Sequence, residues 1–270
     1  ADEIFNLINN YTDQKELLGL YSYFDKKYQL PERVVKQKIR QHIARSYLFK
    51  SGKFNSKLRI KNIPKSILQY GALFYALFFT KRKSKVKNFK LIIDNICAPH
   101  ELERFEKLLN LVGKDKVLCV TRDINIEQDF SKYHIYNKKL FRDINLKDLL
   151  KSIFSEFFLG IWVVLRVSIK TKVNLFPVSL QIIHSYLSSK ALFESNRAQY
   201  MIQERHYDTN AVKNYMFKRL GGVASTSIQK NIFQTDPIFF YIDTDVLFSL
   251  GNDGYSRAFE YGGRIDYIEP

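Results

Sequence analysis

Apolar residues recur every three or four positions along the first part of the chain, which is the spacing of amphipathic helices. Residues 1–30 contain two such stretches, and a basic one follows over residues 32–49. A denser apolar run then occupies residues 67–79. The pattern therefore predicts a basic helical region over residues 1–88.

Beyond residue 88, short apolar runs alternate with segments of helical spacing. Such alternation is typical of a parallel sheet with crossover helices. We therefore predict an α/β fold, a Rossmann-like parallel sheet over residues 89–270. The expected strands are 89–94, 116–121, 133–136, 198–202 and 223–228, and the expected helices are 99–111, 178–193 and a segment that Asp208 and Thr209 cap and Gly221 ends.

Polar residues gather where three of the expected strands end. In open parallel sheets, ligands bind beyond the carboxyl ends of the strands, so these residues are candidates for one cleft. The alternative is that each is an ordinary solvated loop residue. The candidates are Asp94 and Asn95 after the first strand, Glu204, Arg205, His206 and Asp208 after the fourth, and Gln229, Lys230 and Asn231 after the fifth.

Residues 146–173 form a long apolar stretch between the third and fourth expected strands. Glu156 and Arg166 interrupt it and Gly160 weakens it, which argues against a transmembrane helix. We expect a buried core helix here; the alternative is a membrane-facing ridge.

The net charge of +16 is concentrated in one segment. Residues 31–90 hold 17 Lys and Arg residues and a single acid, Glu32, so the rest of the chain is neutral. The partner of this segment should therefore be polyanionic. The apolar run at 67–79 is shorter than the roughly 20 residues of a membrane-spanning helix, and a basic cluster follows it directly. That cluster is Lys81, Arg82, Lys83, Lys85 and Lys87.

An apolar segment beside such a cluster suits the surface of an anionic membrane. A core helix followed by a solvated basic loop is the alternative. No nucleic acid is expected as a partner, because basic and aromatic residues do not interleave as in a recognisable binding module.

The cysteines, the possible metal ligands, the glycines and the start of the chain bear on which classes of protein and which location are expected. Cys119 falls in an expected strand and Cys97 lies just after another, and both are predicted to be reduced core thiols. No cluster of ligands demands a metal, and no glycine-rich phosphate loop follows Asp94, as a dinucleotide fingerprint requires. The start of the chain is acidic and lacks the pattern of a signal peptide, so a cytoplasmic location is expected.

The last quarter of the chain carries a resemblance to a known family. The run Gly-Gly-Val-Ala-Ser-Thr-Ser-Ile-Gln-Lys-Asn-Ile over residues 221–232 is followed by Asp-Val-Leu-Phe-Ser-Leu-Gly over residues 245–251. Together they resemble the N-terminal part of GT-B glycosyltransferases of bacterial surface-polysaccharide synthesis (capsule or lipopolysaccharide). In that family a strand ending in Gln and a basic or imidazole residue precedes a short strand ending in Gly. Lys230 stands where many relatives carry His.

The resemblance implies an enzyme that transfers a sugar from a nucleotide-sugar donor to a glycan or lipid-linked acceptor at the inner face of the cell membrane, without a metal or other cofactor. It implies that residues 89–270 form the acceptor-side domain and that Arg264 to Pro270 cross toward a second, donor-binding domain. Such a transfer needs a base, and Glu204, His206 and Asp208 are the candidates. Asp208 is expected to cap a helix, which leaves Glu204 and His206. Glu204 is favoured, because a carboxylate between Arg205 and the cleft can remain ionised and be held in place. Arg205, Gln229, Lys230, Asn231, Asp94 and Asn95 would bind substrate.

Two other functions remain open. A polyol-phosphate transferase of teichoic-acid type would use a CDP-linked donor on the same fold. A non-catalytic membrane-binding scaffold would keep the basic segment while the polar strand ends served no reaction.

Overall fold

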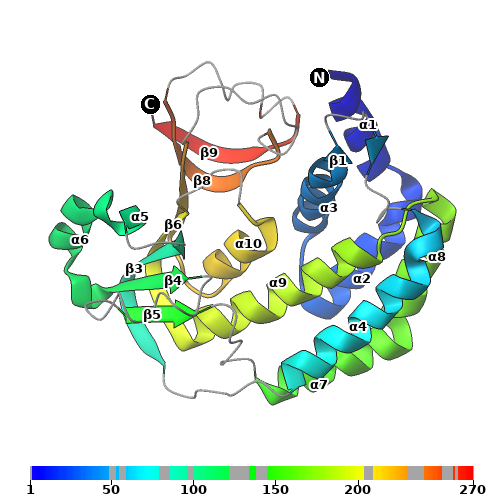
Figure 1. Cartoon of the computed structure of the whole chain (residues 1–270), viewed down its shortest axis with the longest axis horizontal. Helices are drawn as coiled ribbons and strands as arrows, with labels where there is room; N and C mark the ends of the chain where they lie inside the picture. The colour runs from blue at the N-terminus through cyan, green and yellow to red at the C-terminus, as the bar shows by residue number, and fades with distance from the viewer. Residues whose placement is uncertain are drawn as a thin grey trace.

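A computed structural model of the chain has an α/β architecture, in which one twisted parallel sheet is flanked by helices (Figure 1). The described residues are 2–48, 53–54, 59–78, 86–96, 100–121, 134–137, 145–203, 209–229, 240–250, 258 and 261–269.

The described residues up to 78 are mostly helical, as the apolar spacing predicts. The second helix ends where Gln29 adopts a left-handed conformation with φ of 53°, and Pro31 precedes the third. The elements are α1 (Asp2–Thr12), η1 (Lys15–Leu17), α2 (Leu18–Tyr28), α3 (Glu32–Ser46), the hairpin of β1 (Tyr47–Leu48) and β2 (Lys53–Phe54), η3 (Ile60–Asn62) and α4 (Ile63–Phe78).

Seven strands form the main sheet, and every neighbouring pair is parallel. Their spatial order is β5-β4-β3-β6-β7-β8-β9. The sheet begins with β3, next to the central strand β6. The chain first builds outward from β3 to β5, returns to β6, and then builds outward in the other direction to β9. This order confirms the predicted Rossmann-like parallel sheet. The strands are β3 (Lys87–Ile96), β4 (Val117–Thr121), β5 (His134–Asn137), β6 (Asn196–Gln203), β7 (Ala224–Ile228), β8 (Asp243–Phe248) and β9 (Arg264–Glu269).

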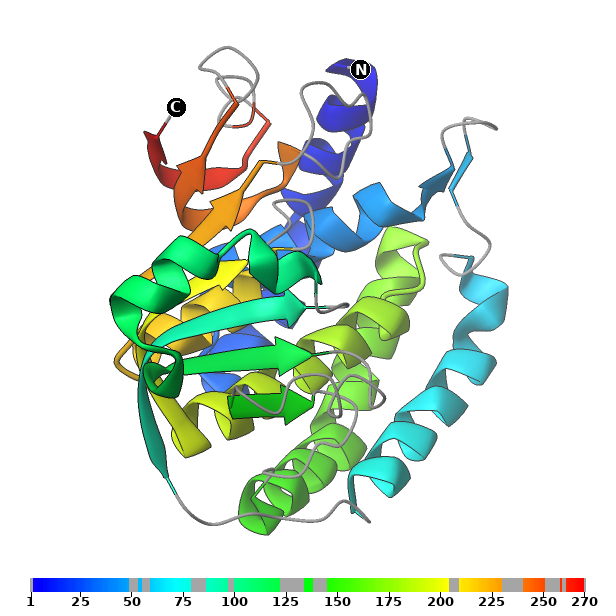
Figure 2. The same ribbon diagram turned by 60° about the vertical axis from the view of Figure 1, so that its left-hand side comes forward.

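Helices cover both faces of this sheet (Figures 1 and 2). The α5–α6 pair lies on one face, whereas α9 and α10 lie on the other and contact α3. The elements between the strands are α5 (His100–Glu103), α6 (Glu106–Val112), η4 (Lys114–Lys116), α7 (Leu146–Ser155), the π-helical turn η7 (Glu156–Gly160), α8 (Ile161–Thr171), α9 (Phe176–Ser195) and α10 (Ala211–Arg219).

Two apolar clusters, a larger and a smaller one, lie on either side of β3, and a third, at β8 and β9, contains Ile242, Leu247, Ala258 and Ile265. Successive residues of a strand point to opposite faces, so Ile92 of β3 joins the larger cluster while Leu91 and Ile93 join the smaller one. The larger cluster also contains buried side chains of α1, α2, α3, α9 and α10. The N-terminal helices therefore share a core with the sheet, and the domain boundary expected near residue 88 stays a prediction.

Cys119 of β4 lies in the smaller cluster as a buried free thiol, as predicted. Burial raises the pKa of this thiol to about 12, so it is protonated at neutral pH. Cys97 lies outside the described residues.

The expectation of a buried helix at residues 146–173 is wrong. α7, η7 and α8 form one continuous helix, Leu146–Thr171, and only 33% of its most apolar window is buried in the protein. Phe157 and Trp162 are among its exposed side chains. Within the described residues it is the one helix whose length and composition would allow it to cross a membrane. Apolar content alone does not reveal how much of a helix another layer covers, which is why the expectation failed.

Three local predictions also need correction. The N-cap of α10 is Asn210 and not Asp208, because the Asn210 side chain accepts hydrogen bonds from the backbone N–H groups of Val212 and Lys213. The helix expected at 99–111 is divided into α5 and α6. The segment that the resemblance assigned to an interdomain crossing forms β9, the parallel edge strand beside β8.

Candidate ligand-binding site

The carboxyl ends of β3 and β6 lie side by side at the centre of the sheet. After β3 the chain builds toward one edge and after β6 toward the other, so the loops that follow these strands diverge. Such a switch point leaves a crevice where ligands bind in open α/β sheets. Asp94 and Gln203 are register partners there. The predicted site residue Asp94 thus lies beside Gln203, the last described residue of β6, and the meeting of the predicted polar clusters stays a prediction.

A β-bulge shapes the end of β3. The pairing with β4 shifts between Asp94 and Ile96, and Asn95 between them has a left-handed backbone with φ of 68°. Asparagine tolerates this conformation better than most residues. Bulges next to active sites re-aim side chains. Both Asp94 and Asn95 are buried.

Asp94 forms a buried ion pair with Lys213 of α10. The Lys213 side chain is 8% exposed and that of Asp94 is 2% exposed, so both charges are removed from water. Removing two charges from water is costly unless their geometry is good, and such pairs are common at functional sites. The Asn210 cap, three residues before Lys213, fixes the start of the helix that carries it.

A chain of buried hydrogen bonds lies next to this pair, between α10 and the sheet. Gln203 Nε2 donates to Asn214 Oδ1 at 2.8 Å, and the Asn214 amide donates to the backbone carbonyl of Asp243. Ser227 Oγ lies 3.3 Å from Gln203 Oε1 and 3.2 Å from the hydroxyl of Thr244. The network links β6, β7 and β8 to α10, and it holds the floor of the crevice in one arrangement.

A pocket of about 150 Å³ adjoins Lys213. Asn210 Nδ2 donates to Ser185 Oγ at 3.0 Å, and burial, followed by the charge of Lys38, lowers the pKa of His184. The imidazole is therefore neutral at pH 7 and offers one donor and one acceptor. Hydroxyl, amide, imidazole and ammonium groups thus face the same small space. The pocket is lined by Tyr136, His184, Ser185, Ser188, Ser189, Leu192, Asn210 and Lys213.

Gln229 occupies the end of β7, as the sequence suggests. Its side-chain oxygen accepts hydrogen bonds from Ser249 Oγ and from the backbone N–H of Leu250, both at 2.9 Å. These contacts fasten the ends of β7 and β8 together.

Most of the other predicted site residues lie outside the described residues. Lys87 is described; it is the exposed first residue of β3. The residues outside the description are Glu204, Arg205, His206, Asp208, Lys230 and Asn231 of the expected cleft, and Lys81, Arg82, Lys83 and Lys85 of the basic cluster.

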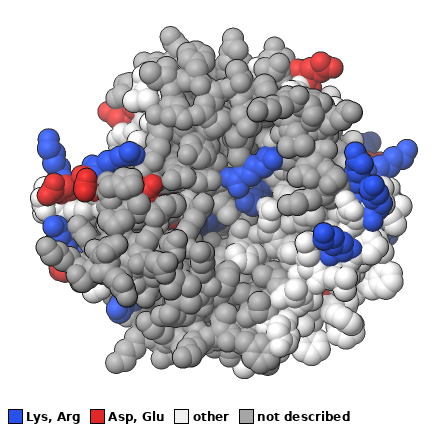
Figure 3. Space-filling view, in the orientation of Figure 1, with Lys and Arg blue, Asp and Glu red and all other residues white. Residues whose placement is uncertain are grey.

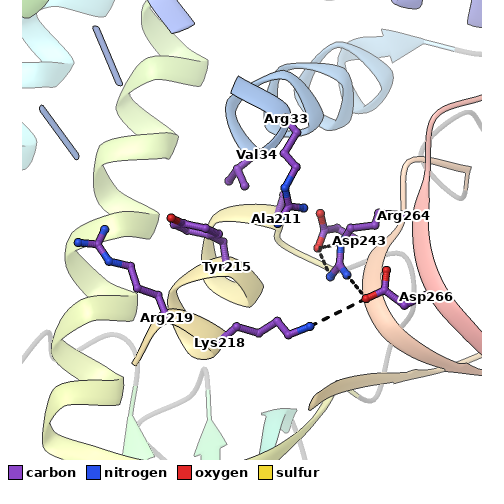
Figure 4. A pocket seen from close by; sticks show the side chains of 9 residues that line it. All are labelled: Arg33, Val34, Ala211, Tyr215, Lys218, Arg219, Asp243, Arg264 and Asp266. Carbon is purple, nitrogen blue, oxygen red and sulfur yellow. Dashed lines mark hydrogen bonds and ion pairs between the residues drawn. The ribbon is translucent and has the colours of Figure 1, made fainter. Parts of the chain in front are cut away.

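A second, larger pocket of about 530 Å³ lies at the opposite, amino edge of the sheet (Figure 4). Arg33 of α3 points into it from above, and Asp243 and Arg264 are the first residues of β8 and β9. The pocket is lined by Arg33, Val34, Ala211, Tyr215, Lys218, Arg219, Asp243, Arg264 and Asp266.

Carboxylates pair with Lys218 and Arg264, two of the four cations that line this second pocket. Arg264 contacts Asp243 at 2.9 Å, Asp245 at 2.8 Å and Asp266 at 2.7 Å, and Lys218 contacts Asp245 at 3.0 Å. Burial alone would raise the pKa of Asp245, but the Ser225 N–H group, Arg264 and Lys218 together lower it to about 2. This network binds β8, β9 and α10 to one another, which gives Lys218, Arg264 and their carboxylates a structural role.

Lys213, Asn214 and His184 were not expected from the sequence. Each lies on a helix at a position where a solvated or core role is the simplest interpretation. The only available signal was the position of Lys213, on the helix that follows the predicted cleft strand.

Among the described residues, no three His, Cys, Asp or Glu side chains gather as a metal site would require. In comparisons with protein-family models, curated proteins and solved structures, nothing matched this chain.

Proposed function

We propose that the protein is a glycosyltransferase of GT-B type, which transfers a sugar from a nucleotide-sugar donor to a glycan or lipid-linked acceptor. The observation that supports this most is the pocket beside Lys213 at the switch point. Its hydroxyl, amide and imidazole groups suit a neutral ligand with many hydroxyls, such as a sugar ring. The absence of a glycine-rich loop after Asp94 disfavours a dinucleotide at this strand end.

The proposed reaction is a displacement at the anomeric carbon. An acceptor hydroxyl oxygen bonds to that carbon, the bond from the carbon to the diphosphate oxygen breaks, and the nucleoside diphosphate leaves with the electron pair. The hydroxyl proton passes to a base. Positive charge or N–H groups must stabilise the departing diphosphate.

Glu204 is the proposed base, because it directly follows Gln203, the register partner of Asp94. His206 is its alternative. Arg205 and Lys230 are proposed to hold negative charge on the acceptor or on the diphosphate. Asp94 and Lys213 are proposed as positioning residues that keep the pocket polar and rigid.

The test is a turnover assay of the natural full-length protein with a panel of nucleotide sugars and lipid-linked or glycan acceptors. We expect acceptor-dependent release of a nucleoside diphosphate. Glu204→Gln should lower turnover about 100-fold or more without changing the melting temperature. His206→Ala should lower turnover by a smaller factor.

Two outcomes would contradict the proposal. Release of CMP from a CDP-linked polyol would indicate polyol-phosphate transfer, and no turnover with any donor would indicate a scaffold. Full turnover of both Glu204→Gln and His206→Ala would show that the reaction does not take place at the end of β6.

A further inference from the structure

One face of the helix Leu146–Thr171 carries large apolar side chains that are exposed to solvent. Phe157 is 69% exposed, Phe158 is 70% exposed and Trp162 is 65% exposed. Phe158 also stacks on Phe154 with parallel rings. Contiguous apolar surface of this kind marks an interaction site. We call this face the aromatic ridge, and its members are Leu150, Phe154, Phe157, Phe158, Leu159, Trp162 and Ile169.

The opposite face of the same helix is fixed in the protein. Leu149, Val164 and Val167 are buried there, and so is Glu156. The Glu156 carboxylate accepts hydrogen bonds from the hydroxyls of Tyr23 and of Tyr28, the latter at 2.7 Å. A helix held in this way presents one side outward and does not cross a bilayer alone.

Exposed cations stand at both ends of the ridge. Lys147 and Lys151 lie at its start, and Arg166, Lys170 and Lys172 at its end. Between residues 152 and 165 the one charged residue is Glu156, which is buried. In Figure 3 the described surface at the lower right, the side on which Figure 1 draws α4, α7 and α8, is mostly uncharged, with Lys and Arg along its border.

We propose that the aromatic ridge docks into the interfacial layer of a bilayer that contains anionic lipids. An apolar stripe flanked by cations is the pattern of helices that lie in the plane of a membrane, and tryptophan favours that layer. The cations favour an anionic surface over a second copy of this chain, since two copies would bring like charges together. The inference does not depend on the proposed transfer reaction.

Trp162 is the single tryptophan of the chain, so its fluorescence reports on the ridge alone. Vesicles of phosphatidylcholine with about one-third phosphatidylglycerol, and vesicles of phosphatidylcholine alone, are the probes. With the anionic vesicles we expect a blue shift of the emission and quenching by lipids brominated on their acyl chains. Pure phosphatidylcholine should produce much weaker effects, and added salt should weaken the binding.

A pair of double variants tests the side chains themselves. Phe157→Ser with Phe158→Ser should weaken vesicle binding about 10-fold or more, which corresponds to a loss of about 1.4 kcal/mol. Leu111→Ser with Tyr267→Ser removes two other large exposed side chains, 85% and 60% exposed, from α6 and β9 and should leave binding unchanged. Melting temperatures of both variants check that they fold.

Several results would overturn the proposal. Vesicle binding without any change in Trp162 emission would place the membrane contact elsewhere. A blue shift that depends on protein concentration and needs no lipid would assign the ridge to a second copy. Equal binding to neutral vesicles, or none to either kind, would also contradict it.

Discussion

Burial of Asp94 and Lys213 costs both charges their hydration, and the attraction between them offsets that cost. Removing one partner therefore leaves the other charge buried without compensation. Asp94→Asn keeps the shape of the side chain but leaves the charge of Lys213 buried without that carboxylate. We expect a loss of about 3 kcal/mol in the free energy of unfolding, measured by urea denaturation. The double change Asp94→Leu with Lys213→Met should recover much of this loss, because no charge is then buried. A loss below about 1 kcal/mol in the single variant would show that the pair is solvated.

For individual residues, the sequence predicted which side chains lie at the ends of strands. It did not predict which other side chains they contact. Asp94, Asn95 and Gln229 were predicted at the ends of β3 and β7 and lie there. Lys213 could not be identified, because its contact with Asp94 depends on how α10 crosses the sheet. Contacts between residues so far apart in the chain follow from packing and not from local spacing.

The helix Leu146–Thr171 carries two faces of opposite character, with the aromatic ridge outside and Glu156 inside. Burial raises the pKa of Glu156 to about 7, although the hydrogen bonds from Tyr23 and Tyr28 act in the opposite direction. Gly160 leaves room for this carboxylate, since a Cβ there would collide with Glu156 and with the Tyr23 hydroxyl. The acid is thus held partly protonated at neutral pH.

This pKa predicts a pH dependence of stability. Between about pH 4.5 and 7 the unfolded chain loses the Glu156 proton while the folded protein keeps it, so stability falls as the pH rises through that window. The total loss is about 3 kcal/mol. Glu156→Gln cannot ionise, so the difference in unfolding free energy between variant and wild type should shift by about this amount, in favour of the variant, from pH 5 to pH 8. A difference that does not vary with pH would mean that Glu156 is solvated.

The spacing of apolar residues predicted most helices and strands correctly. The strands β3, β4, β6 and β7 and the helices α1, α2, α3, α9 and α10 were all expected, because a buried parallel strand is a short apolar run and a surface helix has a periodic one. The strand β9 was interpreted as a crossing segment because the family resemblance implied one there, and its alternating polar residues Arg264 and Asp266 belong to an edge strand. The orientation of the helix Leu146–Thr171 was missed because its outer face is as apolar as a core face.

At the scale of the whole molecule, positive charge and the aromatic ridge should act together at a membrane. Replacing Lys81, Arg82, Lys83, Lys85 and Lys87 by Gln should weaken binding to anionic vesicles strongly, since each cation near such a surface contributes about 1 kcal/mol. The fraction that still binds should show the same bromolipid quenching of Trp162, because the ridge is unchanged. Quenching lost together with the cations would show that the basic cluster, and not the ridge, contacts lipid.

The central claim is that substrate binds in the pocket beside Lys213 at the carboxyl edge of the sheet and not in the larger pocket at the amino edge. Ser188 lines the first pocket, and among the described residues its hydroxyl donates to carbonyls of its own helix, so Ser188→Phe should fill the space with little loss of stability. Arg33→Ala alters the second pocket and is the matched control. The decisive measurement is kcat/KM for the acceptor in the transfer assay. We predict a decrease of about 10-fold or more in Ser188→Phe and none in Arg33→Ala. Unchanged kcat/KM in Ser188→Phe, with a decrease in Arg33→Ala, would contradict the account.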